Sequence, residues 1–149
     1  MKHKYLLDAS ALINIVSLII IEKLKDAPFE LWITQLTPFE IGNSLWKLYI
    51  LKEAKKEECS SVMKLLKMLL NLNLLKVIYV KEFEEVLEIS MKRKVTFYDA
   101  SYVLAAKKHN FHLVTDDKGM TAAATAEKVD VLNSDEFIRK FNGYFVIES

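Results

Sequence analysis

The sequence predicts a three-layer α/β/α fold with a central, mostly parallel sheet. Short apolar stretches rich in β-branched and aromatic residues alternate with longer stretches of helical periodicity along nearly the whole chain. Strands that alternate with helices favour a parallel sheet covered on both faces. The chain has 149 residues, of which 52% are hydrophobic, enough for one core and too few for two ordinary domains. Residues 1–149 are therefore interpreted as a single domain.

The predicted elements follow one another with few interruptions, since the chain has only three glycines and two prolines. The predicted strands cover residues 4–7, 31–34, 77–80, 111–115 and 129–132. The predicted helices cover residues 9–25 (one or two helices), 37–52, 55–72, 83–92, 96–108, 116–126 and 134–141. Thr37-Pro38-Phe39-Glu40 predicts a helix start, with threonine as N-cap, proline at the first helical position and glutamate completing a capping box. Thr96 and Asp99 form a weaker version of that signal.

Composition limits the classes of function. The 21 Lys and Arg residues nearly balance the 20 Asp and Glu residues, so any contact with RNA must come from a local patch. The single cysteine, Cys59, has no partner for a disulfide, which favours a reducing, cytoplasmic setting. The apolar run at residues 11–21 contains Asn14 and Ser17 and is shorter than the ~20 residues of a membrane helix. Because Asp8 also interrupts any signal-peptide pattern, we expect neither a membrane span nor a signal peptide.

Acidic side chains fall where the predicted fold would bring them together. Asp8 ends the first strand, Asp116 and Asp117 follow the fourth, and Glu40 and Asp99 lie in the first turns of helices. In parallel α/β sheets, ligands bind beyond the carboxyl ends of the strands. Clustered carboxylates repel one another, and a divalent cation removes that cost. An all-oxygen ligand set suits Mg²⁺ or Mn²⁺ rather than zinc, and such a site favours phosphodiester hydrolysis.

Four motifs carry a resemblance to a known family. They are YLLDASALI from Tyr5, TPFEIGN from Thr37, TFYDASY from Thr96 and LVTDD from Leu113. In this order and at these separations they resemble the signatures of the PIN-domain family, and they extend over nearly the whole chain. The resemblance implies that four carboxylates are catalytic and bind one or two ions, namely Asp8, Glu40, Asp99 and Asp117. It also implies that Ser10, Asn43 and Thr115 hydrogen-bond these carboxylates or their waters.

The fourth acid has an alternative. The family's last acid usually follows a threonine by two positions, which favours Asp117, but the adjacent Asp116 remains a second candidate ligand. Glu40 and Asp99 also have a structural interpretation, because each lies where a helix-capping side chain is expected. Capping alone does not explain acids at two strand ends as well.

The resemblance also implies a function. By this resemblance the chain is expected to be a metal-dependent endoribonuclease with RNA as substrate. It would be the VapC-like toxin of a type II toxin–antitoxin pair, with a cognate antitoxin as partner and a homodimer as assembly. One alternative is a PIN-fold, RNA-associated adaptor that binds without turnover. Another is a haloacid-dehalogenase-like phosphotransferase with Asp8 as nucleophile, which is disfavoured because Ser10 stands where that chemistry needs a second acid.

Several other groups of residues have simpler interpretations. His109 and His112 are expected to be a helix-end and a strand histidine with local partners, not zinc ligands. Basic residues are expected to cap a helix end or to lie on solvated faces, with contact to an RNA backbone as the alternative. These basic residues are Lys47, Lys52, Lys55, Lys56, Lys92, Arg93 and Lys94.

Two apolar features predict buried or shared surfaces. Trp46 and Tyr49 continue the apolar pattern of their helix and are expected in the core or in an interface, with base stacking as the less favoured alternative. Residues 62–75 are apolar on more than one helical face and are expected to expose a stripe for a homodimer or an antitoxin segment, unless the helix is fully buried.

Overall fold

The computed structural model of the chain describes residues 2–147 and confirms the predicted fold class. Five parallel strands form one sheet in the order β3-β2-β1-β4-β5. The strands are β1 (His3–Leu7), β2 (Phe29–Thr34), β3 (Leu75–Ile78), β4 (His112–Val114) and β5 (Val131–Leu132). The first strand thus occupies the centre of the sheet, and its carboxyl end points toward the loops that enter the helices.

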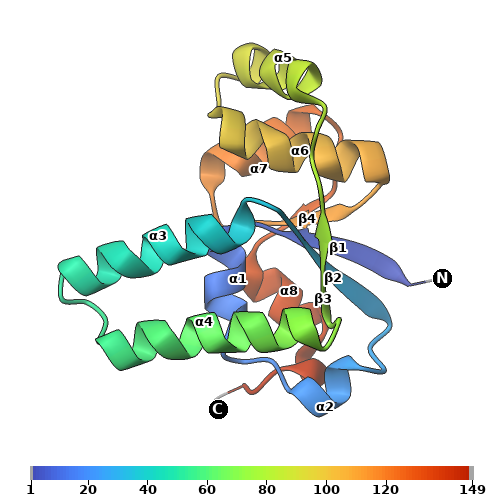
Figure 1. Cartoon of the computed structure of the whole chain (residues 1–149). Helices are drawn as coiled ribbons and strands as arrows, with labels where there is room; N and C mark the ends of the chain where they lie inside the picture. Colours follow the sequence, from blue (N-terminus) through green and yellow to red (C-terminus); the bar gives the residue numbers. More distant parts are fainter. Residues whose placement is uncertain (1, 148–149) are drawn as a thin grey trace.

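Helices cover both faces of this sheet (Figure 1). The helices are α1 (Ala9–Val16), α2 (Ile21–Leu24), α3 (Thr37–Ile50), α4 (Lys56–Asn71), α5 (Phe83–Arg93), α6 (Phe97–His109), α7 (Lys118–Ala126), α8 (Ser134–Lys140) and the 3-10 turn η1 (Asn142–Tyr144). Helices α1, α3, α4 and α8 share one hydrophobic core with the sheet, and α5, α6 and α7 share the other. The predicted helix at residues 9–25 is two helices.

The alternation of side chains along β1 divides the two cores. Tyr5 and Leu7 face the first core and Leu6 faces the second, as the two-residue period of a strand requires. Tyr5 packs against Phe29 and Phe137 with ring centroids 6.2 Å and 5.0 Å away. All three rings are buried, and each contributes about 1.5–3 kcal/mol of burial free energy. These contacts fix the strand that ends in Asp8.

Two predicted details of local structure are wrong. Thr37 is the first residue of α3 and not its N-cap, and no capping box forms, because its hydroxyl bonds Tyr102 Oη at 2.7 Å and accepts from the Thr34 amide at 3.1 Å. Strand β3 lies two residues earlier than the predicted strand at 77–80. The amide and carbonyl of Val80 are instead bonded to the side chain of Gln35, both at 2.9 Å. Thr96 does cap α6, by accepting from the Asp99 amide at 3.0 Å.

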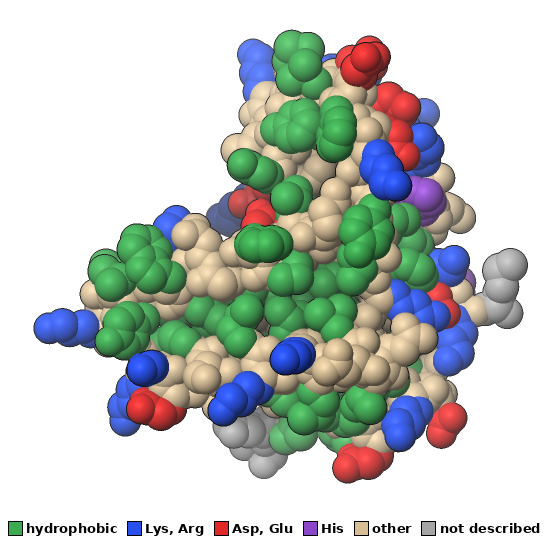
Figure 2. All heavy atoms as spheres, viewed as in Figure 1, with side chains coloured by type: hydrophobic (Ala, Val, Ile, Leu, Met, Phe, Trp, Pro, Cys, Tyr) green, Lys and Arg blue, Asp and Glu red, His purple; other side chains and the backbone are tan. Residues whose placement is uncertain are grey.

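Helices α3 and α4 form a pair that extends beyond the sheet and exposes apolar side chains (Figures 1 and 2). Trp46 and Tyr49 are exposed, so of the two predicted locations the core is wrong and an interface stays a prediction. Helix α4 buries Leu66 and Leu69 but exposes Met63, Met68 and Leu72, which confirms the exposed stripe predicted for residues 62–75. Within residues 2–147, no helix is both long and apolar enough to cross a membrane.

Candidate active site

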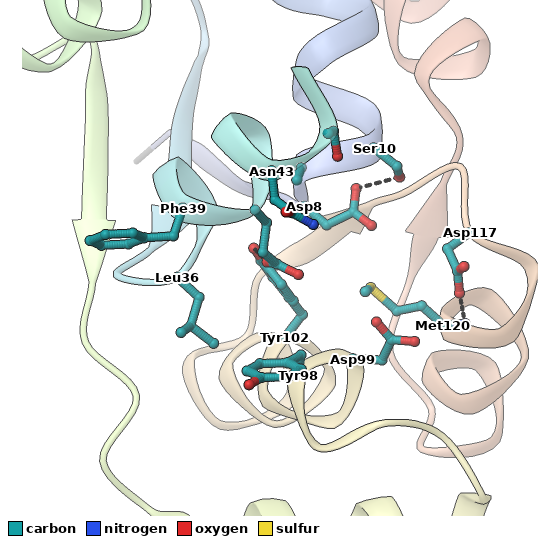
Figure 3. Close-up of a pocket in the computed structure, with 13 residues that line it drawn as sticks. Asp8, Ser10, Leu36, Phe39, Asn43, Tyr98, Asp99, Tyr102, Asp117 and Met120 are labelled. Atoms are coloured by element: carbon teal, nitrogen blue, oxygen red, sulfur yellow. Dashed lines mark hydrogen bonds between the residues drawn. The ribbon is translucent and has the colours of Figure 1, made fainter. Parts of the chain in front are cut away.

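The four predicted acids line one cavity at the carboxyl end of β1 (Figure 3). The cavity has a volume of about 570 Å³. Its lining consists of Asp8, Ala9, Ser10, Leu36, Phe39, Glu40, Asn43, Ser44, Tyr98, Asp99, Tyr102, Asp117 and Met120. Asp8, Glu40, Asp99 and Asp117 come from four separate segments, and none of the described side chains around them is basic. The fold therefore concentrates negative charge at this point.

Asp8 is the most firmly held of the four acids. Its side chain is only 4% exposed and accepts three hydrogen bonds. Ser10 Oγ and the Ala11 amide donate to Oδ1 at 2.8 and 2.9 Å, and Thr115 Oγ1 donates to Oδ2 at 2.5 Å. Burial nevertheless raises the pKa of Asp8, and these donors offset only part of that cost. Ser10 and Thr115, both predicted as neighbours of the acids, thus orient this carboxylate.

The two adjacent acids after β4 have different surroundings. Asp117 lines the cavity and caps α7, where its Oδ2 accepts from the Met120 amide at 2.7 Å. Asp116 points away from the cavity lining. Its carboxylate accepts from Asn14 Nδ2 at 2.7 Å and from the amide and hydroxyl of Ser134 at 2.8 and 2.7 Å. Asp116 therefore joins α1 to α8, whereas Asp117 remains the acid directed to the cavity.

Glu40 lies one turn into α3, and a buried tyrosine sets its orientation. Tyr102 Oη donates to Glu40 Oε1 at 2.5 Å and is bonded on its other side to Thr37 Oγ1. Burial raises the pKa of Glu40, the Tyr102 hydrogen bond opposes this, and the charges of Asp8 and Asp99 raise it further. The Tyr102 hydroxyl, buried beside this carboxylate, has a pKa well above its usual range, so it remains a donor.

Asp99 is half-buried in the first turn of α6. Burial raises its pKa, and the charges of Asp117 and Asp8 raise it again, while the Thr96 hydroxyl lowers it. The acids thus influence one another across the cavity, although their side chains come from distant parts of the sequence. Asn43 also lines the cavity, and its predicted hydrogen bond to a carboxylate or a water stays a prediction.

The residues around this cavity fit a hard divalent cation by their donor chemistry. All four candidate ligands offer carboxylate oxygens, as Mg²⁺ and Mn²⁺ prefer. Burial raises the pKa values of three of them, Asp8, Glu40 and Asp99, and the charges of neighbouring acids raise these pKa values further. A cation would relieve both costs. Within residues 2–147, however, no three His, Cys, Asp or Glu side chains are arranged closely enough to hold an ion without adjustment. Joint coordination therefore requires side-chain rotation, for which the half-buried Glu40 and Asp99 have room.

Comparison with known proteins identifies the family. The model of the PIN domain matches residues 5–126. This chain belongs to the PIN-domain family. It is 35% identical over 131 residues to "Exonuclease VapC9" of Pyrobaculum aerophilum, in an alignment that covers 88% of this chain and 92% of the relative.

Solved structures show the same fold for this PIN domain. The crystal structure of PAE2754 from Pyrobaculum aerophilum superposes with a TM-score of 0.75 at 28% identity, covering 96% of this chain and 98% of that one. VapBC-1 from nontypeable Haemophilus influenzae gives a TM-score of 0.57 at 16% identity, covering 89% and 98% of the two chains. A toxin–antitoxin complex from Klebsiella pneumoniae gives 0.52 at 17% identity, covering 86% and 95%.

Sequence reasoning missed several residues of the PIN domain's cavity. Tyr102 was noted only as the end of a motif, yet it lies three residues after Asp99, one turn along the same helix face. Phe39 and Tyr98 also line the cavity and immediately precede Glu40 and Asp99. An aromatic residue directly before each of these two acids was the sequence signal that could have identified Phe39 and Tyr98.

The predicted basic and histidine residues lie outside this cavity. Arg93 Nη2 and Lys107 Nζ lie 2.6 and 2.8 Å from the buried Glu127 carboxylate, and Lys92 Nζ lies 3.9 Å from it. Lys92 and Arg93 lie in the last turn of α5, where the helix-end interpretation places them, and RNA contact stays the untested alternative. His112 stacks on Tyr5, with centroids 4.9 Å apart, and His109 stacks on Phe111. Both histidines have the local partners that were expected.

Proposed function

We propose that this protein is a divalent-metal-dependent endoribonuclease that hydrolyses phosphodiester bonds in RNA, with Asp8, Glu40, Asp99 and Asp117 as ligands of one or two Mg²⁺ or Mn²⁺ ions. The observation that carries the proposal is the concentration of these four carboxylates in one cavity whose described lining has no basic side chain. Such a cavity repels a phosphate unless a cation is present. The exonuclease name of a relative at 35% identity supports phosphodiester cleavage by the family fold.

The chain's own residues would prepare the site for the ion. Asp8, held by three donors, keeps one orientation and defines the floor of the cavity. Tyr102 occupies Glu40 Oε1, which leaves Oε2 to bind or to accept a proton. When bound, a divalent cation supplies the chemistry that carboxylates lack, because it activates water for attack on phosphorus and offsets the negative charge of the transition state. Buried Thr115 and exposed Ser10 hold the Asp8 carboxylate in place, because their hydroxyls each donate to it.

We also propose that the protein is the toxin of a type II toxin–antitoxin pair, bound by an antitoxin and assembled as a homodimer in the cytoplasm. One structural neighbour titled as a toxin–antitoxin complex and another titled as VapBC-1 support an antitoxin partner. The exposed apolar side chains of α3 and α4 supply surface for protein partners (Figure 2). This role predicts that expression without the antitoxin arrests growth and that Asp99→Asn abolishes the arrest.

The decisive experiment incubates purified protein with total cellular RNA in Mg²⁺ or Mn²⁺ and maps the cut ends. EDTA and Asp99→Asn should each abolish cleavage. Asp135→Asn, which neutralises an exposed carboxylate outside the cavity, is the matched control and should leave cleavage intact. Cleavage that survives EDTA and Asp99→Asn would disprove the mechanism. Binding of RNA without any cleavage would favour the adaptor alternative.

A circular RNA separates the two modes of nuclease action. An endoribonuclease opens the circle and then shortens the linear product, whereas an exonuclease requires an end and leaves the circle intact. The proposal predicts that circular and linear forms of one RNA are first cut at the same sites. Degradation of the linear form alone would reassign the protein as an exonuclease with the same metal site.

A further inference from the structure

Each of two cavity acids directly follows an exposed aromatic residue. Phe39 precedes Glu40 in the first turn of α3, and Tyr98 precedes Asp99 in the first turn of α6. The Phe39 side chain is 81% exposed and that of Tyr98 is 57% exposed, yet both line the cavity (Figure 3). Two helices that are distant in sequence therefore present an aromatic ring at the rim of the same site.

Folding does not account for these rings. Among residues 2–147, neither ring packs against another aromatic ring, and the Tyr98 hydroxyl makes no hydrogen bond. Tyr102, one turn after Tyr98, shows the contrast, because it is buried and bonded on two sides. A buried phenylalanine side chain contributes to stability, whereas an exposed one contributes little. The exposed rings of Phe39 and Tyr98 at the cavity rim are thus free to contact a ligand.

The charge of the cavity indicates what that ligand contacts. With four carboxylates and no basic side chain in the described lining, the protein offers no direct ion pair to a phosphate there. A bound cation can hold the scissile phosphate, but it does not hold the nucleotides on either side. Uncharged aromatic faces bind nucleobases by stacking. Stacking is compatible with negative charge nearby and does not depend on the base sequence. Phe39 and Tyr98 are the exposed aromatic side chains of this cavity.

We propose that Phe39 and Tyr98 are a pair of stacking platforms that hold the nucleobases flanking the scissile phosphate. This inference rests on the proposed nuclease function and names the residues that position its substrate. A base that stacks on either ring has left its own helical stack, so the pair selects unpaired nucleotides. Base stacking then supplies the substrate affinity that surface lysines supply in other nucleic-acid sites.

The first test measures contact without turnover. A short unstructured RNA with one 5-iodouridine is mixed with the whole protein, with Ca²⁺ in place of Mg²⁺ to slow cleavage, and irradiated. Cross-linked residues are then mapped by mass spectrometry. We expect the cross-links at Phe39 and Tyr98. Cross-links confined to other residues, such as Trp46 or Tyr49 on α3, would overturn the proposal.

The second test uses variants that differ only in aromaticity. Phe39→Leu and Tyr98→Leu should each raise the KM for RNA roughly 5- to 150-fold, the range given by the loss of one stacked base, with a smaller change in kcat. Phe39→Tyr and Tyr98→Phe keep a ring and should retain the parental KM. Thermal unfolding of all four variants should match the parent, because both side chains are exposed. An unchanged KM in both leucine variants would contradict the proposal.

The outcomes separate this inference from the proposed function. If the parent cleaves RNA but the leucine variants are unaffected and cross-links lie elsewhere, the stacking pair fails and the nuclease stands. If no RNA is cleaved but Phe39 and Tyr98 cross-link, the nuclease and its scissile phosphate fail, and only base stacking by the two rings stands. If the leucine variants change only self-association in sedimentation, the rings belong to a protein interface and the stacking proposal is overturned.

Discussion

The Tyr102 hydroxyl donates to Glu40 Oε1 at 2.5 Å and thereby couples α6 to α3 across the cavity. The same hydroxyl is bonded to Thr37 Oγ1 at 2.7 Å, so one buried tyrosine fixes both the start of α3 and the direction of its acid. This contact replaces the capping box that the sequence of α3 predicts. It also makes Tyr102 a positioning residue for a candidate metal ligand.

Tyr102→Phe should free the Glu40 side chain and weaken metal-dependent cleavage more than it lowers stability. Loss of each of the two Tyr102 hydrogen bonds should cost about 0.5–1.5 kcal/mol of unfolding free energy. Because the Tyr102 donor lowers the pKa of Glu40, its removal should move the rise of cleavage with pH to higher pH and raise the Mg²⁺ concentration for half-maximal rate. Rate profiles against pH and Mg²⁺ would show this. Tyr144→Phe, outside the cavity, is the control, and identical profiles for Tyr102→Phe and the parent would refute the role.

Asp99→Asn should stabilise the metal-free protein while removing activity. Burial and the charges of Asp117 and Asp8 raise the pKa of Asp99, so the ionised form is disfavoured in the folded state. A neutral amide removes that cost. Thermal unfolding in EDTA at neutral pH should therefore give a higher Tm for Asp99→Asn than for the parent. Added Mg²⁺ should then stabilise the parent more than the variant, and a lower Tm for the variant in EDTA would contradict this account.

The stability of the metal-free protein should fall as pH rises above the ordinary carboxyl range. The pKa values of Asp8, Glu40 and Asp99 are raised in the fold, so the folded state binds more protons than the unfolded state between the ordinary and the raised values. Their contribution to unfolding free energy decreases through that window and stays low above it. Denaturant unfolding in EDTA across mildly acidic to neutral pH tests this.

That pH effect has an opposing contribution that a variant can separate. The pKa of Glu127 is lowered, chiefly by its hydrogen bond to Lys107, so its contribution is lost as pH falls below the ordinary glutamate value of 4.5. Above that value the cavity acids should dominate. In Asp99→Asn the unfolding free energy should fall less steeply with rising pH than in the parent. An equally steep fall in the variant would show that Asp99 does not contribute to this pH dependence.

Asp116 and Asp117 should respond differently to substitution. Asp116→Ala removes the acceptor of Asn14 and of two Ser134 donors and should cost about 1–3 kcal/mol of stability, with cleavage at low temperature preserved. Asp117→Asn should abolish cleavage. Denaturant unfolding and cleavage assays on both variants would detect the difference. A reversal, with Asp116 essential for chemistry, would assign the fourth ligand to Asp116.

Glu127→Ala should weaken the fold without altering the site. The Glu127 side chain is 4% exposed at the end of α7 remote from Asp117, and it neutralises Arg93 and Lys107. Its loss should lower the unfolding free energy by about 1–3 kcal/mol, because Lys107 is half-exposed and can turn to solvent. RNA cleavage below the melting range should equal that of the parent. Reduced cleavage by a fully folded variant would indicate that this cluster contacts the substrate.

The sequence predicted the features that depend on local residue patterns and on where the strands end. Asp8 and Asp117 follow apolar strands, and the edge of a parallel sheet brings such residues together regardless of detail. It failed where a distant side chain competes with a local signal. The Tyr102 hydroxyl displaces the expected role of Thr37, and the Gln35 side chain takes the backbone of Val80 out of the sheet. For Trp46, periodicity shows an apolar helix face but not whether the core or a partner covers it, and the structure excludes the core.

Anomalous diffraction from crystals soaked in Mn²⁺ would show whether the four cavity acids, Asp8, Glu40, Asp99 and Asp117, jointly bind a hard divalent cation. We expect one or two manganese peaks inside the cavity, with carboxylate oxygens of these residues at about 2.0–2.2 Å, and loss of the peaks in Asp99→Asn. Crystals that diffract well, with manganese absent from the cavity or bound only elsewhere on the surface, would contradict joint binding.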